Sequence, residues 1–499
     1  MVSSINNASS NARQKLEKLA MEKILILDGA MGSVIPVFKG RPLTEGDFRA
    51  ERFKDHSRPL KGCNDLLCLT MPGLISEIHE AYLKAGADII ETCSFNATAV
   101  SLADYGLGDL SYEINVAAAC LARRAADSFS TQDKPRFVAG VLGPTAKSAG
   151  ICQDLNNPEK RAICWDELES SYYDNARGLL DGGVDLILIE TIFDTLNAKA
   201  AIFAVRRLAE ERNIDLPIMI SVTVSGAGRL LSGQSVEAFG VSVLYADPFA
   251  LGLNCSFGAE KLKAHIAAIS AAVPCFVSAH PNAGLPNHTG AYDESPESMA
   301  DHIEEYLREG IVNIIGGCCG STPAHIAAIA EKAKNYSPRP IQAKPPKNLL
   351  AGTEVLEIEG PLNIGENTDA EKNSEISRLI KEGNYEDAVD ILREIAESGA
   401  KLVEICIDDN TAADMTNFLN SALMYPDIAR LPVMIKSSRW DLIEAGLKCL
   451  PGKGLANFIR LNEKDAEFLR LVHLVHAYGA AVAINSGLIA FFDAPSKNS

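Results

Sequence analysis

The chain has 499 residues, of which 47% are hydrophobic and 22% are charged. This composition is typical of a folded globular protein, and the length allows two or three domains. The 47 Lys and Arg residues against 65 Asp and Glu residues give a formal net charge of −18, which argues against nucleic acids and membrane surfaces as partners. No apolar run reaches the ~18 residues that a membrane span needs.

Residues 1–20 form a polar lead-in to a helix and lack the apolar core of a signal peptide. Without a secretion signal, the 12 cysteines are expected to be reduced thiols or metal ligands rather than disulfides. We therefore expect a cytoplasmic protein.

One unit recurs before residue 340: a helical pattern, a turn of small residues, and a short apolar run that stops at polar or reactive residues. Glycine suits the end of a helix, and continuous apolar runs suit strands that are buried on both faces. Eight units over roughly 320 residues favour an α/β fold of the (β/α)₈ TIM-barrel type, with an open doubly wound sheet as the alternative. The eight predicted strands are Ile24–Leu27, Ile89–Ile90, Phe137–Leu142, Leu186–Ile189, Ile218–Val224, Ala250–Leu253, Phe276–Ala279 and Val312–Ile315.

A predicted linker separates this barrel domain, residues 21–336, from a second α/β domain, residues 353–499. Proline and lysine crowd the linker, residues 337–352, and make it stiff and extended. The second domain has too few strand-like runs to close a barrel of eight, so a partial, truncated barrel is predicted. Its exposed sheet edge invites pairing, and we expect a homo-oligomer through this domain. The runs are Leu362–Ile364, Leu402–Ile407, Val433–Ile435, Phe458–Leu461 and Ala480–Ile484.

Three cysteines follow predicted strands six and eight, at the strand ends where barrel enzymes carry their reactive groups. Cys255 follows strand six, and the adjacent pair Cys318 and Cys319 follows strand eight. Neighbouring strand residues point to opposite faces, so both paired thiols can face one ion only if the flanking glycines let the backbone turn. Three thiolates leave one tetrahedral position of Zn²⁺ open, and a substrate thiol bound there is deprotonated and nucleophilic. Burial of unrelated cysteines in the core is the alternative.

Two acidic residues are candidates for binding an amino-acid substrate. Asp28 opens an Asp-Gly-Ala-Met-Gly loop whose backbone N–H groups are able to hold a carboxylate. Asp28 and Glu190, which ends predicted strand four, could meet the ammonium group of one amino acid. A helix N-cap for Asp28 and a barrel-rim hydrogen bond for Glu190 are the alternatives. His280 precedes Pro281 and is interpreted as a turn residue, not as a metal ligand.

Eight stretches of the first domain together resemble the homocysteine methyltransferase family, and most closely the front half of the cobalamin-dependent methionine synthases within it. They cover roughly residues 20–335 in order, which makes the resemblance specific. They are LILDGAMGS (25–33), NDLLCLT (64–70), ETCSFNAT (91–98), VAGVLGPT (138–145), ETIFDTLNAKAA (190–201), GLNCSFG (252–258), AHPNAGLPN (279–287) and IIGGCCGSTPAHI (314–326).

The resemblance implies methyl transfer to the thiol of homocysteine, giving methionine, at a zinc ion. It implies that the zinc ligands are Cys255, Cys318 and Cys319. It also implies that homocysteine contacts Glu190 and the loop of Asp28, Gly29, Ala30 and Met31. One departure is Cys93, where relatives commonly carry asparagine.

The tail is similar to the methyltetrahydrofolate-binding barrel of the same family. Asn457 matches a pterin-side asparagine, but the family's Gly-Glu-Arg-Thr-Asn is Gly-Glu-Asn-Thr-Asp at 365–369, and its Asp-Ser-Ser is Lys-Ser-Ser at 436–438. Lys436 cannot accept the hydrogen bonds that a pterin-contacting carboxylate accepts. These departures argue against methyltetrahydrofolate binding. The similar stretches are LNIGENTDA (362–370), RLIKEGNYEDAVD (378–390), YPDIARLPVMIKSSRW (425–440) and EAGLKCLPGKGLANFIRL (444–461).

The cobalamin-binding signature Asp-x-His-x-x-Gly occurs around none of the nine histidines. We therefore expect methylcobalamin to be supplied in trans by a separate corrinoid protein. The alternatives are a small sulfonium or betaine donor, or a non-catalytic scaffold that docks a corrinoid protein. The open set of three thiols argues against the scaffold.

Overall fold

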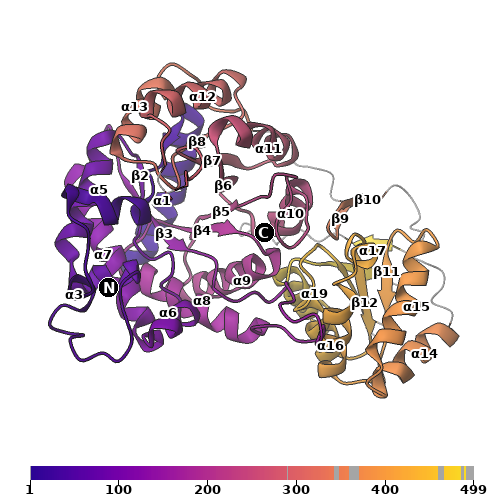
Figure 1. Ribbon diagram of the computed structural model, residues 1–499. Coiled ribbons are helices and arrows are strands. Elements are labelled where there is room, and N and C mark those ends of the chain that lie inside the picture. The colour runs from indigo at the N-terminus through magenta and orange to yellow at the C-terminus, as the bar shows by residue number, and fades with distance from the viewer. Residues whose placement is uncertain are drawn as a thin grey trace.

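The computed structural model describes residues 2–288, 290, 292–341, 348–358, 370–458, 466–484 and 488–490. Figure 1 shows a large α/β barrel with a smaller α/β domain beside it. The eight strands of the large barrel are parallel and follow the order β1-β8-β7-β6-β5-β4-β3-β2, and a parallel bridge between Leu27 and Ile89 joins β1 to β2. The predicted (β/α)₈ fold is confirmed. No helix in the described part of the chain is long and apolar enough to cross a membrane.

Each strand of the barrel overlaps one of the predicted apolar runs, and four strands continue into the polar residues that follow. The strands are β1 (Leu25–Ile26), β2 (Ile89–Glu91), β3 (Phe137–Leu142), β4 (Leu186–Ile192), β5 (Ile218–Val222), β6 (Ala250–Gly258), β7 (Phe276–Asn282) and β8 (Ile314–Ile315). The extensions of β2, β4, β6 and β7 carry polar residues into the barrel mouth.

A helix follows every strand and covers the outside of the barrel. These helices are α5 (Pro72–Ala85), α7 (Ser111–Phe129), α8 (Trp165–Asp181), α9 (Thr195–Arg212), α10 (Val236–Val243), α11 (Ala259–Ala272), α12 (Pro296–Glu309) and α13 (Pro323–Ala333). Shorter helices lie in the loops after β1 and β2: α2 (Met31–Val34), α3 (Glu45–Arg49), α4 (Leu67–Thr70) and α6 (Ala99–Leu102).

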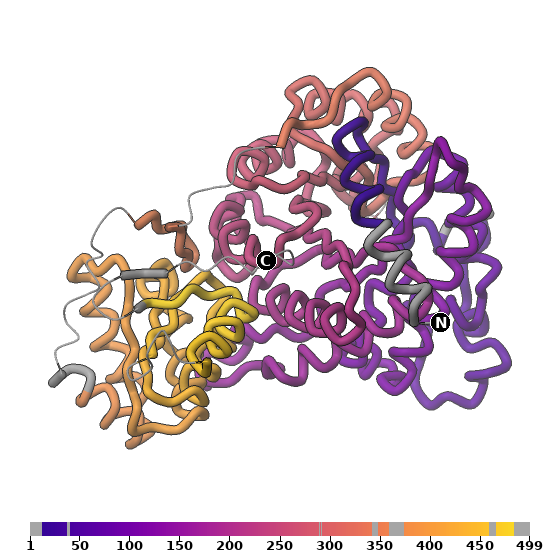
Figure 2. Tube along the Cα trace, turned by 180° about the vertical axis from the view of Figure 1, so that it is seen from behind, coloured from indigo at the N-terminus to yellow at the C-terminus, as the bar shows by residue number. Residues whose placement is uncertain are grey.

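Helix α1 (Val2–Glu22) closes the end of the barrel at which the strands begin. Leu16 and Ala20 are fully buried in one cluster with the first inward-facing strand residues, such as Leu25. Arg13 donates hydrogen bonds to Asp215 and Asp247, which precede β5 and β6. Figure 2, seen from behind, shows α1 on the near side of the barrel. The opposite end, where the strands finish, is therefore the end that faces the viewer in Figure 1.

The second domain contains a five-stranded sheet in the order β11-β12-β13-β14-β15, parallel except for the last pair. Three predicted strands are confirmed as β11 (Val403–Ile405), β12 (Val433–Ser437) and β14 (Ala481–Ile484). The run predicted at 458–461 overlaps β13 (Leu455–Phe458) only at Phe458, and the run at 362–364 lies outside the described residues. The antiparallel strand β15 (Leu488–Ala490) was not predicted. The helices are α14 (Ala370–Lys381), α15 (Tyr385–Glu397), α16 (Ala412–Ala422), α17 (Pro426–Ala429), α18 (Trp440–Leu447) and α19 (Ala466–Ala477).

A β-hairpin joins the domains and starts within the predicted linker. It consists of β9 (Leu349–Ala351) and β10 (Val355–Glu357), and its turn packs on the loop before α10. The Gln234 side chain donates to Gly352 O at 2.8 Å, and Ser235 N donates to Thr353 O at 3.1 Å. These bonds attach the end of the linker to the first barrel.

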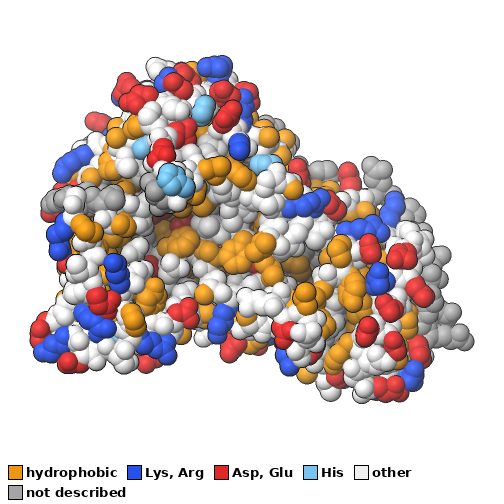
Figure 3. All heavy atoms as spheres, in the orientation of Figure 1, with side chains coloured by type: hydrophobic (Ala, Val, Ile, Leu, Met, Phe, Trp, Pro, Cys, Tyr) orange, Lys and Arg blue, Asp and Glu red, His pale blue; other side chains and the backbone are white. Residues whose placement is uncertain are grey.

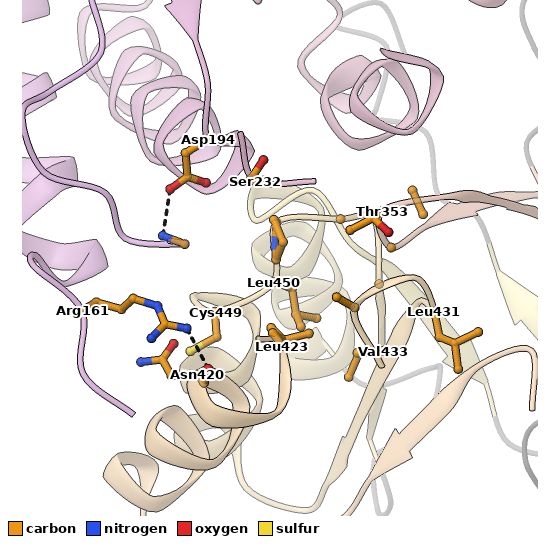
Figure 4. Close-up of a pocket in the computed structure, with 17 residues that line it drawn as sticks. Arg161, Asp194, Ser232, Thr353, Asn420, Leu423, Leu431, Val433, Cys449 and Leu450 are labelled. Atoms are coloured by element: carbon orange, nitrogen blue, oxygen red, sulfur yellow. Dashed lines mark hydrogen bonds between the residues drawn. The ribbon is translucent and has the colours of Figure 1, made fainter. Parts of the chain in front are cut away.

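The junction between the domains is built around a buried lysine. Lys199 on α9 is 1% exposed, and its ammonium group donates to Leu450 O at 2.9 Å and Gly452 O at 3.0 Å in the second domain. Nearby, Arg161 donates to Asn420 O at 2.7 Å, and the Asn420 side chain donates back to Glu159 O at 3.0 Å. Figure 4 shows Arg161 and Asn420 beside a junction cavity of about 50 Å³. The space suits a few waters rather than a substrate.

A prediction follows from His79, which lies on α5, is 0% exposed, and has no hydrogen-bond partner for either ring nitrogen among the described residues. Burial lowers its pKa from 6.5 to about 4, so the folded protein holds it neutral. The unfolded chain binds the proton first on acidification, so stability is lost as the pH falls below 6.5. Between pH 7.5 and 5, His79 should lower the free energy of unfolding of the unchanged protein by about 2 kcal/mol. We expect His79→Leu to lack this contribution, so its stability should fall by about 2 kcal/mol less over the same pH range.

Urea unfolding of both proteins at the two pH values measures this difference. His473→Gln, at an exposed position of α19, is the matched control and should retain the full pH dependence. An equal loss of stability in His79→Leu and the unchanged protein would contradict the prediction.

Candidate metal and thiol site

The sulfur atoms of Cys255, Cys318 and Cys319 lie within 4.8 Å of one another at the mouth of the barrel. The Sγ atoms of Cys255 and Cys319 are 3.8 Å apart. Cys255 belongs to β6, whereas the paired cysteines follow β8, so the site joins residues from second-neighbour strands. All three thiols are half-buried.

Cys255 reaches the other two sulfurs because β6 bends sharply at this point. Cys255 and Ser256 have φ values of 62° and 63°, and the register with β7 shifts between Asn254 and Gly258. Left-handed backbone at residues other than glycine costs of order 1–3 kcal/mol and persists only where neighbouring structure holds it. The Ser256 side chain supplies part of that support, because its Oγ accepts a hydrogen bond from Val224 N at 3.0 Å.

The loop that carries the cysteine pair is attached to the end of β7. Cys318 N donates to Pro281 O at 2.7 Å, and Cys319 O accepts from Ala283 N at 2.9 Å. Gly320 has φ 80°, and a Cβ there would lie 2.3 Å from Cβ of Tyr292. A side chain at position 320 would therefore clash, and Gly320 is one of the flanking glycines expected to let the backbone turn beside the pair.

Asn254 connects the sulfur cluster to strands β4 and β5. Its Oδ1 accepts from Thr191 N at 3.0 Å and from the Ser221 hydroxyl at 2.8 Å. Its Nδ2 donates to Thr191 Oγ1 at 2.7 Å, and it lies 3.5 Å from Glu190 Oε2 and 3.8 Å from Cys318 Sγ. Thr191 also has a left-handed φ, 56°, which is rare for a β-branched residue. One fully buried amide therefore holds two strained strand ends together.

A second cluster of polar groups lies next to the sulfurs. Ligand atoms of Glu91, Glu190 and His280, from β2, β4 and β7, are within 4.8 Å of one another. Glu190 and His280 are buried, and Glu91 is partly exposed. His280 was predicted as a turn residue, but the structure turns its ring toward two carboxylates. Glu91 and Asn254 were not selected from the sequence; the signal available was their position directly after an apolar run.

Hydrogen bonds and burial together set the charges of both clusters. Hydrogen bonds from Cys318 and Cys319 lower the pKa of Cys255, whereas hydrogen bonding to the Cys255 sulfur raises the pKa of each of the other two thiols. Burial raises the pKa of Glu190 and of Glu91. Burial also lowers the pKa of His280 to about 3, so this ring is neutral.

The predicted substrate loop lies beside these clusters, but part of it is already bonded internally. Both oxygens of the buried Asp28 carboxylate accept from Glu91 N, at 3.2 and 3.1 Å. The Ala30 N–H donates to the Ser321 hydroxyl at 3.2 Å. Gly29 is buried and Met31 half-buried in the same loop. Asn457, the predicted folate contact, lies on β13 in the second domain.

The fold and site define a barrel enzyme with an open set of three thiols. Residues 25–333 match the family model described as homocysteine S-methyltransferase, and residues 367–487 match the one described as pterin binding enzyme. The chain belongs to the homocysteine S-methyltransferase family and is a methyltransferase with a second, pterin-binding-type domain.

Among solved structures, the chain is similar to the homocysteine methyltransferase MmuM from Escherichia coli. The metallated form is 25% identical, with a TM-score of 0.48, over 64% of this chain and 100% of that one. The oxidized form is 25% identical, with a TM-score of 0.47, over 62% of this chain and 96% of that one.

A prediction concerns Asn254. We expect Asn254→Ala to lower the free energy of unfolding by about 1–3 kcal/mol, because it leaves Thr191 N and the Ser221 hydroxyl without their buried acceptor. Chemical denaturation measures the loss. Asn417→Ala, which removes a half-buried amide from α16 in the second domain, is the control and should cost less. Equal stability of Asn254→Ala and the unchanged protein would contradict the role of Asn254.

Proposed function

We propose that this protein transfers a methyl group to the thiol of homocysteine, giving methionine, with Zn²⁺ held by Cys255, Cys318 and Cys319. The observation that carries the proposal is the convergence of these sulfurs. In a tetrahedral site with Zn–S bonds of about 2.3 Å, neighbouring sulfurs are roughly 3.8 Å apart. The Sγ atoms of Cys255 and Cys319 are separated by 3.8 Å. The donor set therefore fits zinc.

Three protein thiolates leave one tetrahedral position for a substrate sulfur. When bound, the zinc ion would keep that sulfur deprotonated and nucleophilic. The protein's own groups arrange the ligands: an Asn282 hydrogen bond stabilises the Cys255 thiolate, and Tyr292 hydrogen-bonds to Cys319. Glu190, beside the sulfurs, is placed to meet the ammonium group of the amino acid.

The methyl donor in this proposal is a methylcorrinoid carried on a separate protein. Three strongly exposed leucines support a macromolecular donor: Leu155, Leu231 and Leu285 are 77%, 72% and 48% exposed. They lie in the loops after β3, β5 and β7, at the end of the barrel that bears the site. Figure 3 views this end and shows a central hollow in which hydrophobic side chains gather.

We expect the purified protein to bind one zinc per chain, and Cys318→Ala to lose both zinc and methyl transfer, because two sulfurs do not complete the donor set. Metal analysis gives the zinc content. Methionine formation from homocysteine is measured with methylcobalamin, methyltetrahydrofolate, betaine and a sulfonium donor side by side. Cys164→Ala, at an exposed thiol outside the site, is the matched control. Full zinc occupancy of Cys318→Ala would refute the ligand assignment.

The second domain is proposed not to bind methyltetrahydrofolate. Lys436 on β12 donates to Glu404 on β11 at 3.1 Å, and the Glu404 side chain is 5% exposed. The strand register places Lys436 beside Asn457, the predicted pterin contact. The buried carboxylate of Glu404 is therefore already paired with a lysine, which has only donors to offer. Residues 365–369, the other departing motif, lie outside the described residues.

Calorimetry with methyltetrahydrofolate should accordingly give no saturable heat. Homocysteine binding to the same zinc-loaded sample is the control for an intact first domain. Saturable folate binding that is weakened by Asn457→Ala would overturn this part of the proposal and restore the donor role of the second domain.

A further inference from the structure

A cavity of about 330 Å³ lies among the loops that follow β1, β2 and β3. It lies on the β2 and β3 side of the barrel, whereas the three thiols follow β6 and β8, and no residue of the sulfur cluster or of the polar cluster beside it lines the cavity. Its volume is at the lower end of the range for small-molecule sites. The cavity is therefore large enough for a ligand and separate from the site described above.

The cavity contains one buried carboxylate, that of Asp65, which is 3% exposed. The hydrogen bonds to this carboxylate come from backbone N–H groups, that of Asn96 at 3.1 Å and that of Asp65 itself. No Lys, Arg or His side chain lines the cavity, and Asp65 has no ion pair among the described residues. Burial raises the pKa of Asp65 to about 6, so the carboxylate is mostly ionised at pH 7.5. A cation beside it would offset the cost of burying this charge.

The other side chains of the cavity suit a flat cation. Tyr105 is half-buried, and its phenolic oxygen has no hydrogen-bond partner within the described part of the chain. Burial raises the pKa of the Tyr105 phenol, and the negative charges of Asp65 and Asp104 raise it further, so these three groups interact with one another. Asp104 is exposed and adds a second carboxylate to the lining. A guanidinium group offers planar N–H donors that pair with carboxylates, and it stacks on aromatic rings.

We propose that the cavity beside Asp65 is a site for an alkylguanidinium cation, either free arginine or an arginine side chain of a bound protein. Asp65 pairs with the guanidinium group, Tyr105 stacks on its plane, and Asp104 contributes further negative charge. The inference does not rest on the proposed function, because the cavity shares no residue with the three thiols. Residues 144–146 line the cavity and begin the loop that carries Leu155, so a bound molecule would lie against this loop.

Calorimetric titration of the full-length protein with N-acetyl-L-arginine amide tests the site. N-acetyl-L-citrulline amide, which has nearly the same shape without the charge, is the matched ligand control. The arginine derivative should bind saturably and at least about 10-fold more tightly, the effect of one charge-assisted hydrogen bond or more. A parallel titration with L-arginine identifies the source of the ligand. Tighter binding of L-arginine than of its amide derivative supports a free amino acid, and the opposite order supports a protein side chain.

Two variants test the roles of the lining residues. Asp65→Asn keeps an acceptor for Asn96 N but loses the charge, so it should bind the arginine derivative about 10-fold or more weakly. Tyr105→Leu removes the stacking surface and should weaken binding by about 2- to 5-fold. Asp109→Asn removes an exposed carboxylate outside the cavity, and as the matched control it should leave the affinity unchanged. The zinc content of each variant checks that its barrel is folded.

Three results would overturn the inference. They are the absence of saturable binding, equal binding of the arginine and citrulline derivatives, and full affinity in both Asp65→Asn and Tyr105→Leu. An equal loss of affinity in Asp109→Asn would also overturn it, since this result would show general attraction of a cation to an acidic protein surface. Methionine formation is measured on the same samples, and its persistence in any of these cases leaves the proposed function standing.

Discussion

The candidate site depends on one backbone reversal, at Cys255 and Ser256. A regular continuation of β6 would carry Cys255 past the barrel mouth, away from the loop after β8. The left-handed φ values of both residues bring the Cys255 sulfur to 3.8 Å from that of Cys319. No glycine lowers the cost of this conformation, so the surroundings have to maintain it. Asn254 does so through its bonds to β4 and β5, which makes the barrel wall itself the support of the sulfur cluster.

The same amide separates two groups that would otherwise repel each other. Thiolates and carboxylates both carry negative charge, and burial strengthens their mutual repulsion. Asn254 presents its two N–H donors toward Glu190, Thr191 and Cys318 and contributes no charge of its own. The pocket therefore gathers acidic groups with no cation of its own among the described side chains, and the raised pKa values of Glu190 and Cys318 favour their neutral forms until a cation binds.

The barrel could be predicted from sequence because its strands are continuous apolar runs. The three cysteines could be selected as site candidates because they follow two of these runs. Glu91 and His280 also follow apolar runs directly. Their side chains lie close together because of how β2 and β7 are placed around the barrel mouth, and the number of residues between them in the sequence does not give the distance between their side chains. The strain at Cys255 has no sequence signal either, since left-handed turns are inferred from glycine. In the second domain, β13 begins at Leu455, before the predicted run, and β15 pairs in the opposite direction to the other strands.

The two domains differ in whether a cation lies beside their buried carboxylates. In the first barrel, Glu91 and Glu190 have no cation beside them among the described side chains, and burial raises the pKa of both groups. In the second domain, Lys436 on β12 instead forms an ion pair with the buried Glu404 on β11. The buried ammonium group of Lys199 likewise ends on carbonyl groups of the second domain rather than in a cleft. The second domain thus contributes packing against α8 and α9, through the rings of Trp165, Phe203 and Tyr478, while the reactive groups converge in the first.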